Sequence, residues 1–369
     1  MPPIELNIRF PKPTQVSVHF DGDETEPLDF QTPIGPEDYA DIAWYLETYA
    51  SHYITDVDID RADNIAKRLK TLGENLFLSV FADATAKRLF DRFQDTGEKR
   101  VITLYAQHPA VLSLPWELLR PPKQTYLMNE KLSIRRRYLG AGGGRTAYKV
   151  SSKDRLRVLF VVSRPSDANF INPRSDALAV MHAIKTTQAN IELEFLRPAT
   201  LDKLINRLEN DRLPPIDILH FDGHGAFFNA AAEPNSAKHA DNPLSKQAQP
   251  ESNNGYLLFE TADGNNDFVS AETLADALYR KKIALVVLSA CQSAAMGDDA
   301  LTSVAARLTH AGLPSVLAMS YSVLVRTTEH LFGEFYNALM QGQAMGAALD
   351  TARRSLNRHP ERGERQCGD

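Results

Sequence analysis

Apolar positions in the second half of the chain follow two periods in turn. Short apolar or β-branched runs predict buried strands, and longer segments with apolar residues three and four positions apart predict helices. The predicted strands span residues 156–162, 191–196, 216–221, 283–288 and 315–319. The predicted helices span residues 176–188, 200–210, 270–280, 301–311, 327–340 and 344–357. Strands of this length that alternate with helices indicate βαβ units, so this half is expected to be α/β with a largely parallel sheet.

The first half of the chain combines both periods without regular alternation. Strands are predicted at 4–10 and 15–20, and Pro11 and Pro13 between them form a break that no central strand tolerates. A helix is predicted after Pro36, where apolar or aromatic residues recur at helical spacing. Further elements are predicted as helices around 64–72 and 83–93, a strand at 101–105 and a compact apolar segment at 114–119. This half is therefore expected to be a mixed α and β structure.

Two segments interrupt these patterns. The glycine-rich run at 140–144 does not open a helix directly after a strand, so it favours a linker over a dinucleotide-binding loop. The polar insertion from Asn229 to Asn254 has no periodicity and predicts a mobile loop beside the sheet edge. The predicted organisation is an N-terminal mixed α/β half at 1–140, a linker at 141–154, a second α/β half at 155–358, and a polar tail at 359–369 that can lead into a further domain.

Composition excludes several classes of protein. Of the 369 residues, 43% are hydrophobic, which is ordinary for a folded chain and not typical of a disordered one. The chain has 41 basic and 47 acidic side chains, a net charge of −6, and no polybasic block, so no nucleic-acid partner is expected. No apolar run approaches the ~20 residues that span a bilayer, and the first residues do not resemble a signal peptide. The sequence therefore predicts a cytoplasmic protein that does not contact membranes.

Cysteine usage agrees with a reducing compartment. The chain has only two cysteines, Cys291 and Cys367, which is too few for a disulfide framework or a structural zinc site. Cys367 lies in the polar tail, whereas Cys291 follows a predicted strand. Only Cys291 is therefore a candidate for chemistry.

The end of the predicted strand 216–221 carries a histidine between two glycines. The strand is followed by Asp222, Gly223, His224 and Gly225. Ligands of open parallel sheets bind outside the carboxyl ends of the strands, so this is a candidate site. The two glycines are expected to let the backbone turn sharply and to leave room for a substrate beside the imidazole. The N–H of Gly225 is also suited to holding an oxyanion.

The end of the predicted strand 283–288 carries the cysteine. Ser289, Ala290 and Cys291 follow this strand directly. A cysteine and a histidine on neighbouring strand ends can act as nucleophile and base, because an imidazole stabilises a thiolate and later protonates a leaving amine. The alternative is that Cys291 is a small buried hydrophobic residue. The sequence leaves both interpretations open.

A zinc site is a competing interpretation of the same residues. His220, His224, Asp222 and Cys291 are all of ligand type, but the two histidines lie on a predicted strand and not on the helix that a His-x-x-x-His site prefers. His220 lies inside the apolar strand and is predicted to be a core residue. The sequence therefore predicts neither a metal nor another cofactor.

Several segments of the chain resemble the CHAT domain family, the bacterial caspase-like cysteine peptidases. The resemblance rests on separate motifs that occur in the order found in the family. They lie at residues 42–47, 114–119 with 126–127, 163–165 with 170–174, 220–225 and 288–293. Together the motifs extend over most of the chain.

The resemblance implies roles for individual residues. His224 would be the general base and acid, and Cys291 the nucleophile. Gly225 and the backbone N–H of Cys291 would form the oxyanion hole. Ser289 and the segment with Ser320 and Tyr321 would line the pocket for the residue before the scissile bond. For Asp222, next to the site in sequence, a substrate contact and a structural role at the strand end are both open.

The resemblance also implies a fold and a function. The fold would be a caspase-like, mostly parallel sheet flanked by helices, with residues 1–140 as a pseudo-caspase-like half. The function would be that of a regulated cysteine endopeptidase that cleaves a specific protein partner in bacterial antiviral defence or cell-death signalling. Because Ser289 replaces the glutamine of animal caspases, no aspartate-specific pocket is implied.

The expected partners follow from the same resemblance. They are a protein substrate and a sensor or activator, either in another domain or in another chain, with activation by assembly as one route. The loop from Asn229 to Asn254 begins a few residues after His224 and is a candidate gate. The alternative function is a catalytically silent caspase-like module that uses the same cleft to bind a peptide.

Overall fold

The chain divides into two compact units, which we describe separately. A computed structural model describes residues 3–49, 55–97, 99–128, 132–139, 154–168, 177–178, 180–182, 190–228, 254–278, 281–292, 304–305, 308–309, 311–321 and 325–359. At 109, 226–228, 254, 291–292 and 325–326 it describes the backbone alone. Unit 1 comprises Met1–Gly140 and Asn357–Asp369, and unit 2 comprises Ala141–Leu356.

Unit 1 is built on a mixed sheet. Its strands are β1 (Ile4–Lys12), β2 (Gln15–Phe20), β3 (Asp23–Glu24), β4 (Leu28–Asp29), β5 (Arg100–Ala106) and β6 (Leu132–Tyr138). They lie in the order β3-β2-β1-β5-β6, and β4 also pairs with β2. β1 is therefore central, antiparallel to β2 and parallel to β5.

The proline break at the end of β1 has a structural explanation. β1 continues through Pro11, although no central strand was expected to tolerate a proline. The last residue that β5 pairs is Phe10, and the register with β2 shifts between Arg9 and Lys12. Pro11 therefore lies at an irregularity beyond the β5 ladder, where its missing N–H removes no pairing bond to β5.

Helices pack on the apolar face of this sheet. They are α1 (Pro36–Ala43), which continues as the π-helical η1 (Trp44–Tyr49), α2 (Asp56–Phe81), α3 (Ala84–Gln94), α4 (Pro109–Leu112) and the 3₁₀ turn η2 (Trp116–Leu118). One core contains alternate residues of β1 and β2 together with aromatic side chains of α2 and α3. This core contains α2 side chains from Leu69 to Phe81, which explains why the helix continues well beyond the predicted end at residue 72.

The apolar segment 114–119 fills this core. Trp116 is fully buried, and its Nε1 donates to the carbonyl of Val111 at 2.7 Å. A Cβ at Gly73 of α2 would lie 2.0 Å from the carbonyl oxygen of Leu118, so only glycine permits this close approach. This family-like segment therefore stabilises unit 1.

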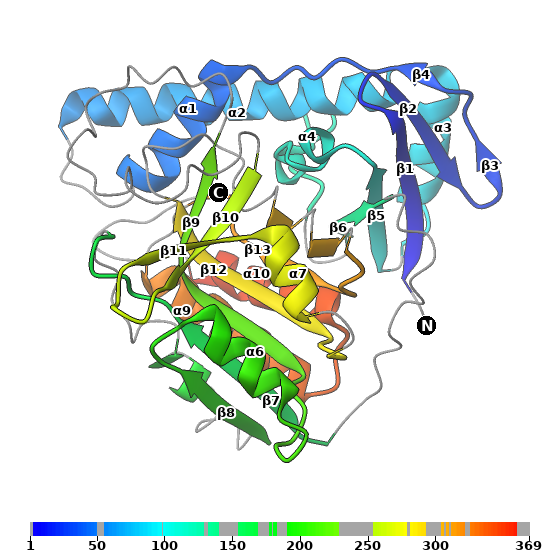
Figure 1. Cartoon of the computed structure of the whole chain (residues 1–369). Coiled ribbons are helices and arrows are strands. Elements are labelled where there is room, and N and C mark those ends of the chain that lie inside the picture. The colour runs from blue at the N-terminus through cyan, green and yellow to red at the C-terminus, as the bar shows by residue number, and fades with distance from the viewer. Residues whose placement is uncertain are drawn as a thin grey trace. The chain divides into compact units, whose positions relative to one another are not determined.

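Unit 2 is built on a mainly parallel sheet (Figure 1). The parallel strands are β7 (Leu156–Val162), β8 (Ile191–Leu196), β9 (Ile218–Phe228), β12 (Leu285–Gln292) and β13 (Val316–Ala318). Their pairings give the order β8-β7-β9-β12-β13. The far end of β9 also pairs with the antiparallel hairpin of β10 (Asn254–Glu260) and β11 (Asn266–Ser270).

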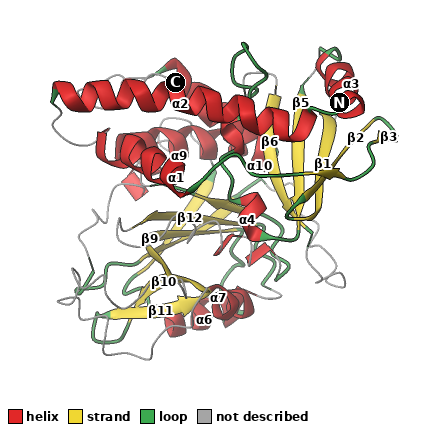
Figure 2. Cartoon of the chain, turned by 90° about the horizontal axis from the view of Figure 1, so that it is seen from above, coloured by secondary structure: helices red, strands yellow, loops and turns green. Residues whose placement is uncertain are grey.

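Helices cover both faces of this sheet, as Figures 1 and 2 show. α6 (Leu201–Glu209) and α7 (Ala271–Leu278) bury Leu204 and Leu274 against one face. α9 (Val325–Met340) and α10 (Met345–Arg358) bury apolar side chains against the other face. None of the helices in the described ranges combines the length and the apolar character needed to cross a bilayer.

Most predicted elements of unit 2 are present, some of them with different bounds. β7 and β8 have the predicted bounds, and α6, α7, α9 and α10 begin within two residues of the predicted starts. β9 and β12 extend well beyond the predicted ends at 221 and 288, because each continues to find a paired neighbour. The β10–β11 hairpin was not predicted. The linker, the loop at 229–253 and most of the helices predicted at 176–188 and 301–311 lie outside the described residues.

Candidate active site

The strand register brings His224 and Cys291 together. In the parallel ladder of β9 and β12, Cys291 is the direct Cα partner of His224, and Ser289 is the partner of Asp222. Neighbouring strands lie about 4.8 Å apart, so the two backbones are adjacent at this point. This confirms that the two residues lie on neighbouring strands. The expectation that they follow the strand ends was wrong, because both lie inside their strands.

The site lies beside the point in the unit 2 sheet where the strand order changes direction. The order β8-β7-β9-β12-β13 runs outward in opposite directions from the boundary between β7 and β9. In sheets of this order, ligands bind outside the carboxyl ends of the strands at that boundary. β9 pairs with β7 through Asp222 and with β10 from Gly225 onward, so His224 lies where β9 exchanges one neighbour for the other.

Alternation along β9 separates core residues from site residues. His220, Asp222 and His224 share the sheet face that α9 and α10 cover, whereas Leu219 and Phe221 belong to the core on the opposite face. His224 is 6% exposed. The imidazole is therefore held in a largely buried setting.

His220 is a core residue, as predicted. It is fully buried, its ring stacks on Phe160 with centroids 4.3 Å apart, and its Nδ1 lies 3.1 Å from the hydroxyl of Tyr336. Four residues of strand separate His220 from His224 by roughly 13 Å, too far for both to bind one zinc ion. In the described ranges, no three His, Cys, Asp or Glu side chains form a group suited to a metal.

Asp222 is engaged by an arginine. Its Oδ1 accepts a hydrogen bond from Nη2 of Arg164 at 2.7 Å, and its backbone carbonyl accepts from Nη1 of the same residue at 2.6 Å. The Asp222 side chain is 4% exposed and the Arg164 side chain 11%. This buried pair joins the end of β7 to β9 two residues before His224. The substrate contact considered for Asp222 remains a prediction, although its carboxylate already has a cationic partner.

Sequence reasoning missed Arg164 as part of the site. Arg164 follows β7 by two residues, and its backbone N–H donates to Oε1 of Glu260 in β10 at 2.8 Å. The signal available was its place in the family-like segment 163–165 at the end of a predicted strand. That segment did not reveal a partner 58 residues away.

The sharp turn predicted at the two glycines is absent. Gly223 lies within β9 and makes no turn. A Cβ there would lie 2.8 Å from Cε1 of Phe221 and 3.1 Å from Cβ of Ser163, so close packing explains the glycine. Gly225 pairs with Gln292 on one side and with Leu257 on the other, so it too lies inside the sheet.

The predicted pocket residues lie toward the same carboxyl edge of the sheet. Ser289 of β12 is 8% exposed. Ala318, the last residue of β13, pairs with Leu288, so Ser320 and Tyr321 follow the neighbouring strand end. Ser320 is exposed and Tyr321 is half-buried. Ser289 thus lies two residues before Cys291 on the same strand, Ser320 and Tyr321 lie just after the strand next to it, and the contact of all three with substrate remains a prediction.

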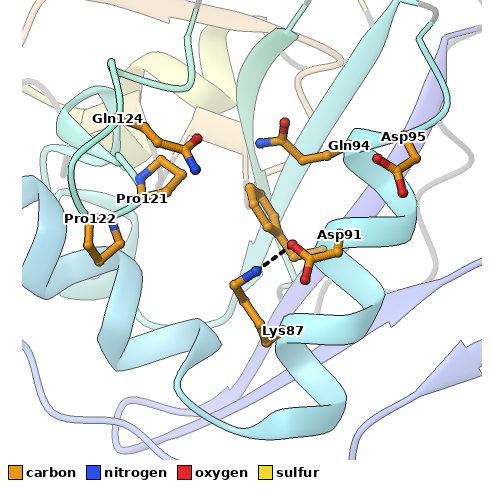
Figure 3. Close-up of a pocket in the computed structure, with 8 residues that line it drawn as sticks. Lys87, Asp91, Gln94, Asp95, Pro121, Pro122 and Gln124 are labelled. Carbon is orange, nitrogen blue, oxygen red and sulfur yellow. Dashed lines mark hydrogen bonds and ion pairs between the residues drawn. The ribbon is translucent and has the colours of Figure 1, made fainter.

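A separate cavity lies in unit 1 (Figure 3). It has a volume of about 450 Å³ and lies between α3 and residues 121–124. Phe90 lines it together with Pro121, and Lys87 and Asp91 form an ion pair at its edge. None of its lining residues belongs to β9 or β12, so it is not part of the site formed by His224 and Cys291.

Comparison with known proteins identifies the family. No curated protein matches the chain. The model of the CHAT domain family matches residues 70–366, which include the C-terminal part of α2, strands β5 and β6, and all described elements of unit 2. The two sheets flanked by helices agree with the α/β caspase-like fold of that family. The chain therefore belongs to the CHAT domain family, a family of caspase-like peptidases.

Proposed function

We propose that the protein is a cysteine endopeptidase in which Cys291 is the nucleophile and His224 the general base and acid. The observation that carries this proposal is the register in which the two residues are direct partners on adjacent parallel strands. Side chains at paired positions of a parallel ladder leave the sheet on the same face. Cysteine-dependent acyl transfer requires a thiol nucleophile and a neighbouring base, and a thiol and an imidazole placed in this way supply both.

The reaction follows from this placement. His224 stabilises the thiolate of Cys291, whose sulfur forms a bond to the carbonyl carbon of the scissile peptide. The protonated imidazole then gives its proton to the leaving amine as the C–N bond breaks, which leaves a thioester. A water molecule that loses a proton to the same imidazole hydrolyses the thioester and restores the thiol. The backbone N–H groups of Gly225 and Cys291 are the proposed donors to the oxyanion.

The proposed substrate is a protein segment whose preferred side chain is not acidic or basic. Ser289, Ser320 and Tyr321, the proposed pocket residues, are uncharged, and Arg164 neutralises the nearby Asp222. These described residues thus offer no free carboxylate to select arginine and no free guanidinium to select aspartate. We assign the cleavage to a specific protein partner in the cytoplasm, controlled by a sensor or activator in bacterial defence or cell-death signalling.

Thiol alkylation tests the pairing without knowledge of the substrate or the activator. The full chain is treated with a low concentration of iodoacetamide, and modification of each cysteine is followed by peptide mass spectrometry. Cys291 is expected to react faster than Cys367, and His224→Gln should remove this advantage because the thiolate loses its imidazole. The exposed His182→Gln is the matched control and should leave the rate unchanged. Equal rates for the parent and His224→Gln would contradict the pairing.

Cleavage of a peptide library under activating conditions tests the enzyme itself. Cys291→Ala should abolish cleavage, and His224→Gln should lower the rate about 10²–10⁴-fold, the usual contribution of a general base. Cys367→Ala should cleave at the parental rate. A reactive Cys291 without cleavage under any activating condition would favour the catalytically silent peptide-binding module.

A further inference from the structure

On the polar face of the unit 1 sheet, Ser17, His19 and Glu24 form a row in which the histidine lies within hydrogen-bond distance of both neighbours. The Ser17 Oγ lies 3.0 Å from Nε2 of His19, and Nδ1 of His19 lies 2.7 Å from Oε2 of Glu24. Ser17 and His19 are two residues apart on β2 and so share one face, and His19 pairs with Glu24 of β3. None of the three belongs to the proposed peptidase site, which lies in unit 2.

The chemistry of the partners fixes the direction of both hydrogen bonds. An ionised carboxylate can only accept, so the proton of neutral His19 is on Nδ1 and is donated to Glu24. Nε2 then has a free lone pair and accepts from the hydroxyl of Ser17. A nucleophile bonded to a base that a third group orients is the arrangement of serine hydrolases, which is recognised by geometry and not by position in the chain.

The surroundings of His19 favour its neutral form, which is the form that can accept a proton. Burial lowers the pKa of His19, and the nearby positive charge of Arg9 lowers it further, while Glu24 opposes both. The imidazole is therefore neutral at pH 7. On β1, Arg9 is the direct partner of Ser17, and Asn7 is the direct partner of His19. The buried Oδ1 of Asn7 has no hydrogen-bond partner among the described residues, so this face also carries an unsatisfied acceptor on the neighbouring strand.

We propose that Ser17 is an activated nucleophile and that this cluster hydrolyses small acyl esters through a seryl ester. Ser17 Oγ forms a bond to the carbonyl carbon while its proton passes to Nε2 of His19. The carbonyl oxygen becomes an oxyanion, and Arg9 supplies the nearby positive charge. The C–O bond to the alcohol then breaks, and the alcohol leaves with the proton from Nε2. Water, deprotonated by the same nitrogen, releases the acid and restores Ser17.

The partly open surface around the row favours small substrates. Ser17 is 8% exposed, whereas the side chains of His19 and Glu24 are 18% and 66% exposed. The serine is thus largely buried, beside a histidine that solvent reaches only in part. A compact ester suits so buried a nucleophile better than a folded protein does.

A fluorophosphonate probe tests the activated serine directly. The full chain with Cys291→Ala is used, so that the peptidase site contributes nothing, and the modified residue is identified by peptide mass spectrometry. We expect an adduct on Ser17 and hydrolysis of p-nitrophenyl acetate. Ser17→Ala should remove the adduct and lower ester hydrolysis at least tenfold. Ser133→Ala changes another buried serine of the same sheet and should alter neither readout.

Two further measurements separate an activated serine from an ordinary buried one. His19→Gln should slow labelling about 10²-fold, because it removes the general base. Labelling of the Cys291→Ala chain should fall on acidification with a midpoint below pH 6.5, because burial and Arg9 lower the pKa of His19. The proposal is overturned if Ser17 carries no adduct, or if His19→Gln is labelled at the parental rate. Neither result depends on whether Cys291 is a peptidase nucleophile.

Discussion

At the scale of single residues, the space around Gly223 controls the position of His224. Gly223 is the residue before the histidine, and it faces the ring of Phe221 and the side chain of Ser163 at distances that exclude any Cβ. A larger residue would therefore force the Phe221 ring to shift and would press against Ser163 at the end of β7. The proposed base is held at its register position by packing, not by the freedom of a glycine turn.

Replacement of Gly223 by alanine should shift β9 and weaken the site. The added methyl group overpacks the core, which usually costs about 1–3 kcal/mol of unfolding free energy. We expect that loss in urea denaturation, together with slower alkylation of Cys291. Phe221→Leu removes the ring atoms that the new Cβ would meet. The double variant Phe221→Leu/Gly223→Ala should therefore be more stable than the sum of the single changes predicts, and strict additivity would argue against the clash.

At the scale of elements, a buried ion pair reinforces the end of the ladder between β7 and β9. Arg164 binds both the carboxylate and the backbone carbonyl of Asp222, and the N–H of Ser163 donates to that same carbonyl at 2.9 Å. These bonds lie where the β7 ladder ends and before the β10 ladder begins. They stabilise the last paired position of the β7 ladder, Asp222, two residues before His224.

Removing only Arg164 from the ion pair should lower the free energy of unfolding more than removing both Arg164 and Asp222. Arg164→Met leaves the Asp222 carboxylate buried without its cation, a change that typically costs about 3–5 kcal/mol. The expected result is a lower urea midpoint than for the parent, with part of the loss recovered in Arg164→Met/Asp222→Leu, which buries no charge. Arg155→Met is the control, because the Arg155 side chain is 55% exposed and its loss should change stability little. A double variant no more stable than Arg164→Met would mean that the ion pair is not the source of the effect.

At the scale of the whole molecule, the family match does not coincide with a structural unit. It begins at residue 70, inside α2, and so leaves out β1 and β2. β1 is the central strand of the unit 1 sheet, and its side chains Leu6, Ile8 and Phe10 are almost fully buried. The matched part of unit 1 therefore needs the unmatched residues in order to fold.

Truncation at residue 70 should unfold unit 1. Of the two tryptophans in the chain, Trp44 and Trp116, the fragment 70–369 keeps only Trp116. In the full chain this ring lies 5.5 Å from that of Phe10 and 6.2 Å from that of Phe30, and the fragment lacks both. The emission maximum of Trp116 in this fragment should lie at longer wavelength than in the full-length Trp44→Phe variant, where Trp116 is also the only tryptophan. The fragment 155–358, which contains the whole unit 2 sheet, should unfold cooperatively. Unchanged Trp116 emission in 70–369 would contradict this dependence on β1.

The sequence by itself determined the features that depend on neighbouring residues. Hydrophobic period predicted β7, β8 and the helices of unit 2 closely, because burial on one face leaves a repeating pattern in the chain. Residue type and context singled out His224 and Cys291 and separated them from His220 and Cys367.

Only the tertiary structure decided which distant residues meet. The direct pairing of Cys291 with His224, the ion pair of Arg164 with Asp222 and the row from Ser17 to Glu24 all depend on strand register. Register is set by the packing of whole elements, and a shift of one residue would turn every side chain of a strand to the other face. Local sequence patterns do not encode the register. Only the folded chain therefore showed how far β9 extends, which side chains leave no room for a Cβ at Gly223, and that Arg164 pairs with Asp222.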